Sequence, residues 1–399
     1  MIEFSGAIIT SSGNWLNAVS TPVPSDVPEY TIRIKFVEGH VPIETGYGQW
    51  SRVLGVGDNV WDWYFRNGTW RNTLNDYIGR QVDAVEVIAA NTSGVYVMWS
   101  LFSGWVNLTS VCSFDTHWVT DFSAFFAGCS KLTTAPYLDT SNATSLVDMF
   151  NGCSLLVSVP QYNTANATNL TGFLRNCVSL SSSPQFNTTS AVSFVQMYAG
   201  CSSLLSSPAL DTSMGSNFTE MFKDCTSLTS VHTYNLSRAT SMRQMFSGCT
   251  SLSAIPAFDT ASVQDFYGTF MGCTAIQTLP TLDTRSAENL SYAFYGCSSI
   301  TTLPLLNLSL ATNMSYFCMG CTNLQSIPAF NIPLVTNMNQ AFRDCYNVAS
   351  GSLSLYQQAS TKAVLVTSHM SVFSDCGRDS NTGREELAQI PTSWGGTMA

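Results

Sequence analysis

Charged residues are scarce in this 399-residue sequence: they make up 11% of it, against about 25% in typical globular domains. The formal net charge is -10, and the sequence has no basic stripe that could neutralise phosphates. We therefore expect no nucleic acid among the partners. With so few charges, the surface must consist mainly of Ser, Thr and Asn, which suits contact with carbohydrate or protein.

Long hydrophobic runs are also missing. No stretch of the sequence is long enough to span a bilayer as a helix. The first residues, Met1–Ile9, have no basic n-region and only a few consecutive apolar residues. From these absences we expect neither a membrane span nor a signal peptide.

Recognisable catalytic motifs are absent as well. The four histidines, His40, His117, His232 and His369, are scattered, and none has a ligand or nucleophile partner at a familiar spacing. There is no Gly-rich phosphate loop, zinc spacing or nucleophile elbow. The sequence thus predicts no enzyme, no metal and no cofactor. Two classes of function remain: a recognition module and a structural part of a virion. Outward residues that vary from one repeat to the next favour the recognition module, and uniform outward residues favour the structural part.

What the sequence does contain is a phrase, best seen from Leu228 to Cys249, that recurs every 24 residues without insertion. Each repeat ends on a cysteine, the first of which is Cys129, and Trp105 stands in the equivalent place 24 residues earlier. We call the regularly spaced cysteines the ladder cysteines: Cys129, Cys153, Cys177, Cys201, Cys225, Cys249, Cys273, Cys297, Cys321 and Cys345. A sustained period of this length is typical of a solenoid, in which each unit buries its apolar face on its neighbours.

The residue pattern of each repeat predicts a short strand, a turn, a short helix and a residue that caps the helix. A strand of three or four residues, such as Leu252–Ile255, ends at the proline that follows in most units. After the turn, apolar residues at steps of 3, 3, 1 and 3, from Ala239 to Cys249, predict a helix of about nine residues. The residue before each ladder cysteine is Gly, Asn or Asp, which predicts a left-handed residue that ends the helix.

The tenth residue after each cysteine position is always Asp or Asn. A metal or catalytic site is one interpretation, but half the row is amide, which suits hard metals poorly. Asp and Asn also bond nearby backbone amides in turns, and we favour this structural role. The row consists of Asp115, Asp139, Asn163, Asn187, Asp211, Asn235, Asp259, Asp283, Asn307 and Asn331.

The ladder cysteines are predicted to be free. Because Trp105 substitutes at the same place, cysteine there acts as a small buried hydrophobic residue rather than as half of a disulfide. Cys318 and Cys321 form a C-x-x-C pair, yet Cys318 stands where another unit has Phe246, which disfavours a redox role. Reduced thiols fit assembly in a cytoplasm better than export.

Residues 1–81 lie outside the repeat and predict a β-rich domain that caps the first coil or docks the chain. Strands are expected at 30–36, 60–65 and 83–88, and residues 1–28 are a candidate docking tail. The domain holds tryptophans that we interpret as core, with a sugar-binding platform as the alternative: Trp15, Trp50, Trp61, Trp63 and Trp70.

Coils are expected over residues 82–350, followed by a capping segment at 351–399. Helices are predicted at 351–361 and 367–375, and Phe373–Cys376 repeats the phrase 31 residues after Cys345. Leu387–Pro391 then repeats the strand phrase after a polar loop at 377–386.

The phrase resembles the BspA-type leucine-rich repeats of bacterial surface proteins and of phages that infect gut bacteria. Residues 251–273 and 322–345 follow that pattern closely, and the likeness covers about residues 82–350. We therefore expect an α/β solenoid of leucine-rich-repeat type with about eleven coils and an N-terminal β cap. The resemblance implies an adhesive or recognition protein without enzymatic activity.

Together with the missing export signal, the resemblance predicts a phage virion protein, such as a tail or head fibre or a receptor-binding protein. It would be assembled in the host cytoplasm, its N-terminal domain would face other virion proteins, and its solenoid would contact a host glycan or protein. A purely structural decoration protein and a bacterial cell-surface adhesin are the alternatives, and a homo-oligomer is left open. The candidate ligand-binding residues on the outward strand side are Tyr137, Gln161, Gln185, Thr134, Ser158 and Ser182.

Overall fold

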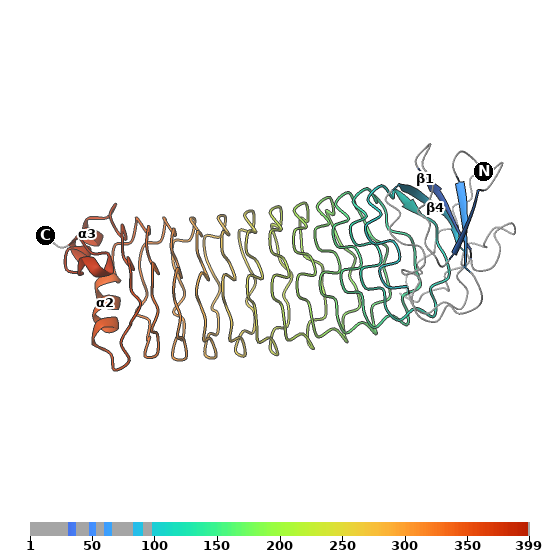
Figure 1. The fold of residues 1–399 in the computed structure, drawn as a ribbon. Helices are drawn as coiled ribbons and strands as arrows, with labels where there is room; N and C mark the ends of the chain where they lie inside the picture. The colour runs from blue at the N-terminus through green and yellow to red at the C-terminus, as the bar shows by residue number, and fades with distance from the viewer. Residues whose placement is uncertain (1–30, 37–47, 53–59, 66–82, 91–97, 398–399) are drawn as a thin grey trace. The chain divides into compact units, whose positions relative to one another are not determined.

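A computed structural model of the chain describes residues 31–36, 48–52, 60–65, 83–90 and 98–397 (Figure 1). The chain divides into two compact units, Met1–Asn166 and Ala167–Ala399. The predicted docking tail, Trp15 and Trp70 lie outside the described residues, as do the side chains of the other three N-terminal tryptophans. The domain boundary expected after residue 81 stays a prediction.

The first unit contains a five-stranded sheet in the order β2-β3-β1-β4-β5. Its strands are β1 (Thr31–Phe36), β2 (Gly48–Arg52), β3 (Val60–Phe65), β4 (Ala84–Ala90) and β5 (Ser110–Val111). The predicted strands correspond to β1, β3 and β4, whereas β2 was not predicted. β4 pairs antiparallel with β1 but parallel with β5, where Val87 lies opposite Val111, one coil later. The same strand therefore belongs to the N-terminal sheet and to the first coil.

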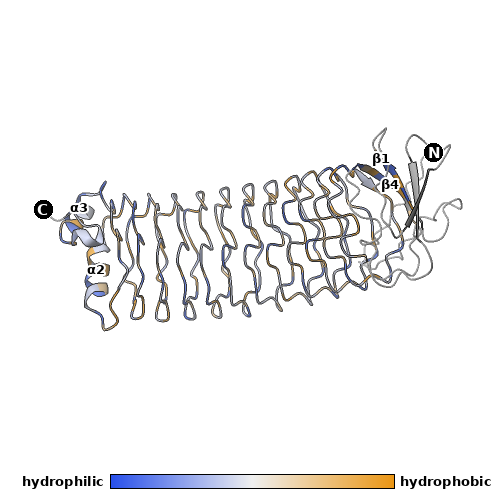
Figure 2. Cartoon of the chain, viewed as in Figure 1, coloured by the Kyte–Doolittle hydropathy of each residue, from blue (hydrophilic) through white to orange (hydrophobic). Residues whose placement is uncertain are grey.

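In both units the coils bury the rows of apolar residues that the sequence predicts, and polar and apolar residues alternate along the chain (Figure 2). Leu228, Phe246 and Cys249 are fully buried. Equivalent rings of successive coils stack, with centroids 5.9 Å apart for Phe222 and Phe246 and 5.7 Å for Phe246 and Phe270. The predicted repeat solenoid of leucine-rich-repeat type is confirmed, because within each unit every coil packs on the coils next to it.

All thirteen cysteines are free, as predicted for the ladder. Each described ladder thiol also has a partner that the sequence did not reveal. The Cys249 Sγ donates to the carbonyl oxygen of Phe222 over 3.1 Å, and the Cys129 Sγ donates to that of Phe102 over 3.0 Å. The thiol thus fills an apolar space and satisfies a buried carbonyl, which an aliphatic side chain could not do.

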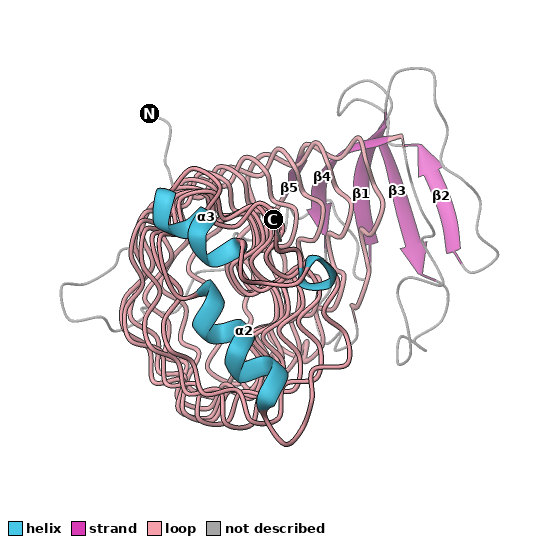
Figure 3. Ribbon diagram, turned by 90° about the vertical axis from the view of Figure 1, so that its left-hand side faces the viewer, coloured by secondary structure: helices cyan, strands magenta, loops and turns pink. Residues whose placement is uncertain are grey.

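The predicted helix in each coil is wrong. Within the described residues, α-helices occur only in the C-terminal segment, as α2 (Ser352–Thr361) and α3 (Asn381–Leu387), with a 3-10 turn at Thr392–Trp394 (Figure 3). The segments expected to be helical are runs of consecutive turns instead. The helix expected at 367–375 is such a run as well.

A left-handed residue in the middle of each run explains why no helix forms. The residue five before the cysteine position has a positive φ, for example 57° at Glu220 and 50° at Gln244, which breaks the helical succession of hydrogen bonds. Amides of Phe218 and Glu220 then donate to carbonyls of the next coil, at 3.1 and 2.8 Å, while that of Met221 donates three residues back. The residue directly before the cysteine position is also left-handed, as predicted.

The predicted strand before each proline does not form in most coils, and only isolated bridges join some of the coils at this place. Ser206 and Ser230 form one parallel bridge, and Ser326 and Ser350 form another. Because proline cannot donate to a ladder, pairing stops after one or two bonds. A second set of bridges, not predicted, joins the coils just before the turn run, as between Asp265 and Asn289.

The Asp and Asn row has the structural role that we favoured. The Asp139 Oδ1 accepts from the backbone amide of Ser141 at 2.9 Å, and the Asp211 Oδ1 accepts from that of Ser213 at the same distance. At Asp139 burial raises the pKa of the carboxyl, but the hydrogen bonds from Ser141 and His117 outweigh it and hold the pKa below its usual range. At Asp211 the hydrogen bonds from Ser213 lower the pKa. The row therefore stabilises turns.

The C-terminal segment closes the last coil with α2 and α3. The Glu386 carboxylate accepts from the amides of Gly351 and Leu353, at 3.2 and 3.0 Å, and so caps the start of α2. The predicted helix at 351–361 is confirmed as α2. The predicted polar loop at 377–386 and strand phrase at 387–391 are wrong, because Ser380 caps α3 within that stretch by accepting from the amide of Gly383.

Candidate functional site

The predicted ligand-binding row faces outward, but its members divide between the two units. In the first unit Thr134 and Ser158 are exposed and form a parallel bridge, and Tyr137 and Gln161 are half-buried. Burial and the nearby Asp139 raise the pKa of the Tyr137 hydroxyl, which keeps it protonated and able to donate. In the second unit Ser182 and Gln185 are exposed. The row's role in binding stays a prediction.

An exposed tryptophan that the sequence analysis did not single out lies in the first unit. Trp118 is 56% exposed, and its ring meets that of His117 edge to face, with centroids 4.8 Å apart. The His117 Nδ1 lies 3.0 Å from the Asp139 Oδ2, and the Asn142 amide donates to the His117 carbonyl over 2.7 Å. These contacts hold His117 in place, and its ring in turn supports one large exposed aromatic side chain.

The most continuous aromatic surface lies in the second unit, on the outward side of the turn runs. Four half-buried tyrosines from three successive coils contact one another, and we call them the tyrosine strip: Tyr267, Tyr292, Tyr295 and Tyr316. Tyr292 stacks on Tyr316 with centroids 4.5 Å apart and an interplanar angle of 13°. Tyr267 and Tyr295 meet Tyr292 at 5.4 and 5.6 Å.

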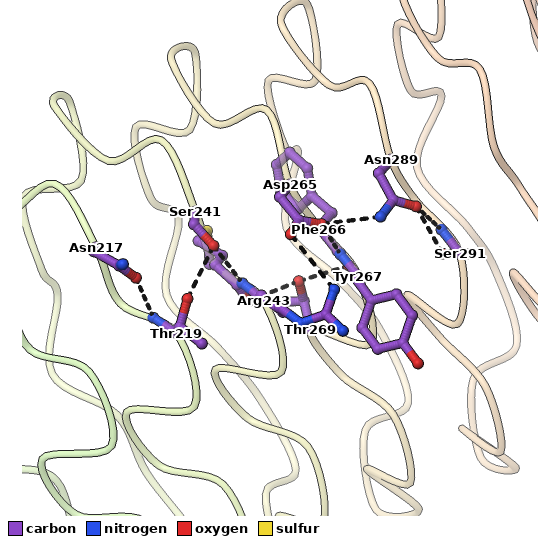
Figure 4. A network of polar contacts seen from close by, with 11 residues as sticks. Asn217, Thr219, Ser241, Arg243, Asp265, Phe266, Tyr267, Thr269, Asn289 and Ser291 are labelled. Atoms are coloured by element: carbon purple, nitrogen blue, oxygen red, sulfur yellow. Dashed lines mark hydrogen bonds and ion pairs between the residues drawn. The ribbon is translucent and has the colours of Figure 1, made fainter. Parts of the chain in front are cut away.

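Polar partners fix both ends of the strip. At one end the Arg243 guanidinium lies 3.8 Å from the centroid of the Tyr267 ring and 3.7 Å from the Asp265 carboxylate. Asp265 also accepts from the Tyr267 amide at 2.9 Å and from the Asn289 side chain at 3.2 Å (Figure 4). At the other end the Gln340 amide lies 3.4 Å from the Tyr316 hydroxyl. The contacts run through five coils without a break.

Two of these tyrosines occupy the left-handed position of the turn run, with φ 60° at Tyr292 and 58° at Tyr316. Glycine is the residue best suited to this conformation, and Gly172 and Gly268 hold the same place in other coils. Burial and the neighbouring tyrosines raise the pKa of the Tyr292 hydroxyl, so it remains a neutral donor at neutral pH. Because the left-handed conformation favours glycine, backbone preference does not explain why two bulky aromatic residues occupy this position.

The tyrosine strip was not predicted, although its signal is present in the sequence. Three of its tyrosines lie five or six residues before the ladder cysteine in neighbouring coils, where other coils have residues such as Glu220 or Gln244. In a helix, Tyr267 and Tyr292 would occupy different faces of their turns. The tandem-turn backbone brings them together.

Within the described residues, no group of three or more His, Cys, Asp or Glu side chains is placed to hold a metal ion. None of the helices described there has the length and hydrophobicity needed to cross a bilayer. The Cys318 and Cys321 thiols are buried, and burial raises the pKa of Cys318 well above its ordinary value. Because reactivity requires an accessible thiolate, these sulfurs are unsuited to thiol chemistry in the folded chain.

The chain is a solenoid of leucine-rich-repeat type, and its sequence places it in a family. A family model described as "Mycoplasma protein of unknown function, DUF285" matches residues 80–183, 184–279, 216–326 and 288–376. These matches cover more than half of the 399 residues, so the chain belongs to the DUF285 family. No curated protein matches the chain in sequence.

Solved structures similar to the chain include bacterial leucine-rich repeat proteins. One from Bacteroides ovatus is 16% identical, with 77% of this chain and 87% of that chain covered and a TM-score of 0.35. One from Eubacterium ventriosum is 15% identical, with 62% and 79% covered and a TM-score of 0.33. The T. pallidum leucine-rich repeat protein is 19% identical, with 59% and 91% covered and a TM-score of 0.27. Similarity at this level bears on neither partner nor activity.

Proposed function

We propose that the chain is a non-enzymatic recognition or adhesion protein that binds a macromolecular partner through outward side chains of its coils. One observation carries the proposal: inward positions are nearly constant from coil to coil, whereas outward positions change chemistry. The residue five before the cysteine position is glutamate at Glu220, glycine at Gly268 and tyrosine at Tyr292. A part with a purely structural role would need no such variation.

The backbone supports this function by holding the outward positions still. In the turn runs of the second unit, alternate amides are bonded to the neighbouring coil, as between Phe222 and Met245 at 2.9 Å. Side chains on such a frame lose little conformational freedom on binding, which favours affinity. Extended repeat surfaces are used in this way by solenoid proteins in general.

The test is binding of the labelled, purified chain to a printed array of bacterial polysaccharides, mucin-type glycans and extracellular proteins. We expect saturable binding to at least one of these macromolecules, with a Kd of about 1 μM or tighter, that is about -8 kcal/mol. Misfolded protein serves as the control: the chain is denatured and returned to buffer under conditions in which it does not regain its native circular dichroism spectrum. Saturable binding to none of the array would contradict the proposal.

Within this function we propose the location predicted from the sequence, in a phage virion, with the N-terminal domain facing the particle. The resemblance to phage repeat proteins supports it, as do thirteen free cysteines, which suit assembly in a reducing cytoplasm. Mass spectrometry and antibody labelling of purified particles decide the matter, because absence from particles refutes it. If the protein is present, Tyr137→Ala combined with Gln161→Ala should lower host adsorption. A bacterial cell-surface adhesin is the alternative.

A further inference from the structure

We propose that the tyrosine strip is a docking surface for a protein partner, contacted through polypeptide rather than through sugar. This inference rests on the proposed function and specifies which surface and which class of partner carry it. It follows from three properties of the strip: how its rings are oriented, how its charges are paired, and which residue types compose it.

The ring faces of the strip are partly covered by neighbouring groups and are not laid open as platforms. Tyr292 and Tyr316 belong to successive coils and lie nearly parallel at 4.5 Å, so each covers one face of the other. The Arg243 guanidinium covers one face of Tyr267 at 3.8 Å. Tyr267 and Tyr295 pack against Tyr292 at interplanar angles of 47° and 46°, so they crowd the stacked pair at a tilt. Sugar rings and nucleobases bind aromatic residues by lying on a free ring face, and the strip has those faces partly occupied.

The charges of the strip are already paired within the chain. The Arg243 guanidinium is 3.7 Å from the Asp265 carboxylate, and Asp265 accepts two further hydrogen bonds. The strip therefore presents no free cationic row, and the whole chain carries a net charge of -10. A polyanion such as a nucleic acid or an acidic polysaccharide would gain little from this surface and would be repelled by the rest.

The residue types are those that dominate the binding energy of protein interfaces. Tyrosine and arginine are enriched among such residues, because they combine large apolar area with a polar tip. Tyrosine also has only two rotatable side-chain bonds, so little freedom is lost on contact. Here the rings are ordered in advance by stacking and by Gln340 at the Tyr316 hydroxyl. Tyr292 and Tyr316 keep this arrangement in a backbone conformation that disfavours them, which points to a role beyond stability.

The experiment selects random peptides displayed on phage against the full chain and measures their affinities for it and for two variants. The strip variant is Tyr292→Asn with Tyr316→Asn, because asparagine tolerates a left-handed backbone, as Asn176 does here at φ 57°. The matched control is Gln196→Asn with Glu220→Asn, at the same left-handed position in coils that have no tyrosine there. Unchanged circular dichroism and urea midpoints establish that both variants fold.

We expect the enriched peptides to bind the strip variant at least about tenfold more weakly than the wild-type chain, and the control variant as tightly as wild type. Peptides that bind all three chains equally, or a selection that enriches none, would overturn the inference. So would an array glycan whose binding is lost in the strip variant alone. If a glycan of the array binds wild type but not the strip variant, the proposed recognition function stands and only the assignment to a protein partner fails. If any macromolecule of the array binds the strip variant as tightly as wild type, the recognition function likewise stands and only its assignment to the strip fails.

Discussion

Raising the pH to about 10 is expected to unfold the chain, because the folded state holds its thiols protonated. Burial raises the pKa of Cys153, Cys201 and Cys273 to about 12, well above the value of about 8.5 in an unfolded chain. A group whose pKa is raised on folding contributes fully below its unfolded pKa and loses that contribution as the pH rises toward its folded pKa. The window of instability therefore opens at about pH 8.5–9 and extends to about pH 12.

The magnitude follows from the number of such thiols. At about pH 10 each loses roughly 2 kcal/mol, and a typical domain has only about 5–15 kcal/mol of stability in all. In the second unit the pKa is raised by burial at these residues: Cys201, Cys225, Cys249, Cys273, Cys297, Cys318, Cys345 and Cys376. The summed loss from even some of these thiols would exceed the free energy of unfolding of a typical domain.

Urea unfolding at several pH values between neutral and about 10, with a phosphine reductant present, measures the effect. Replacing Cys249 and Cys273 by alanine removes two titrating groups, so the loss of stability with pH should become shallower although the neutral-pH stability falls. Equal free energies of unfolding at neutral pH and at about pH 10 would show that the thiols do not titrate in the unfolded chain as proposed.

Truncating Phe246 to alanine is expected to lower the free energy of unfolding by about 3–5 kcal/mol. Its ring is fully buried and stacks on Phe222 and Phe270 of the adjacent coils, so its removal opens a cavity against three coils at once. Because coils contact only their neighbours, the surrounding structure has little freedom to collapse into the space.

The matched control is Phe246→Leu, since Leu174 occupies the same place in its own coil. Leucine fills most of the volume, so this variant should lose less than about 1.5 kcal/mol. Denaturant unfolding with both variants distinguishes the two effects. Equal losses in both variants, or a loss below about 1 kcal/mol in Phe246→Ala, would be inconsistent with a ring packed between neighbouring coils.

The solenoid and its inward rows could be predicted from the sequence because the 24-residue step of the cysteines is unbroken. Asp139 and Asp211 were correctly interpreted as turn residues, since a row of mixed acids and amides suits backbone bonding. The free state of the thiols followed from Trp105 in the same place. These features depend on local chemistry repeated in every coil, which one sequence displays many times.

The turn run could not be separated from a helix by periodicity. Inward residues Phe218, Met221, Phe222 and Cys225 have spacings of 3, 1 and 3, which a helical face also produces. The distinguishing residue is the left-handed one, and most coils fill it with residues such as Glu220, which carry no turn signal. α3 was missed because its N-cap lies in a stretch rich in polar residues.

The candidate site was predicted only in part. Tyr137 and Gln161 are outward as expected, but the tyrosine strip also depends on the contact of Tyr267, six residues before its cysteine, with Tyr292, five before the next one, at 5.4 Å. A helix would have separated these side chains. The sequence shows that tyrosines gather in these coils and that Tyr292 and Tyr316 are equivalent, whereas the contact of Tyr267 with Tyr292 follows only from the turn backbone.

Far-ultraviolet circular dichroism of the purified chain tests the central structural claim most directly: tandem turns tied coil to coil, and not helices, build the face that carries the tyrosine strip. Among the described residues, the α-helices are the ten residues of α2 and the seven of α3. We therefore predict a spectrum with only weak helical ellipticity. A spectrum in which roughly a quarter of the residues or more are helical, as one helix of about nine residues in each of about eleven coils would give, would contradict this claim.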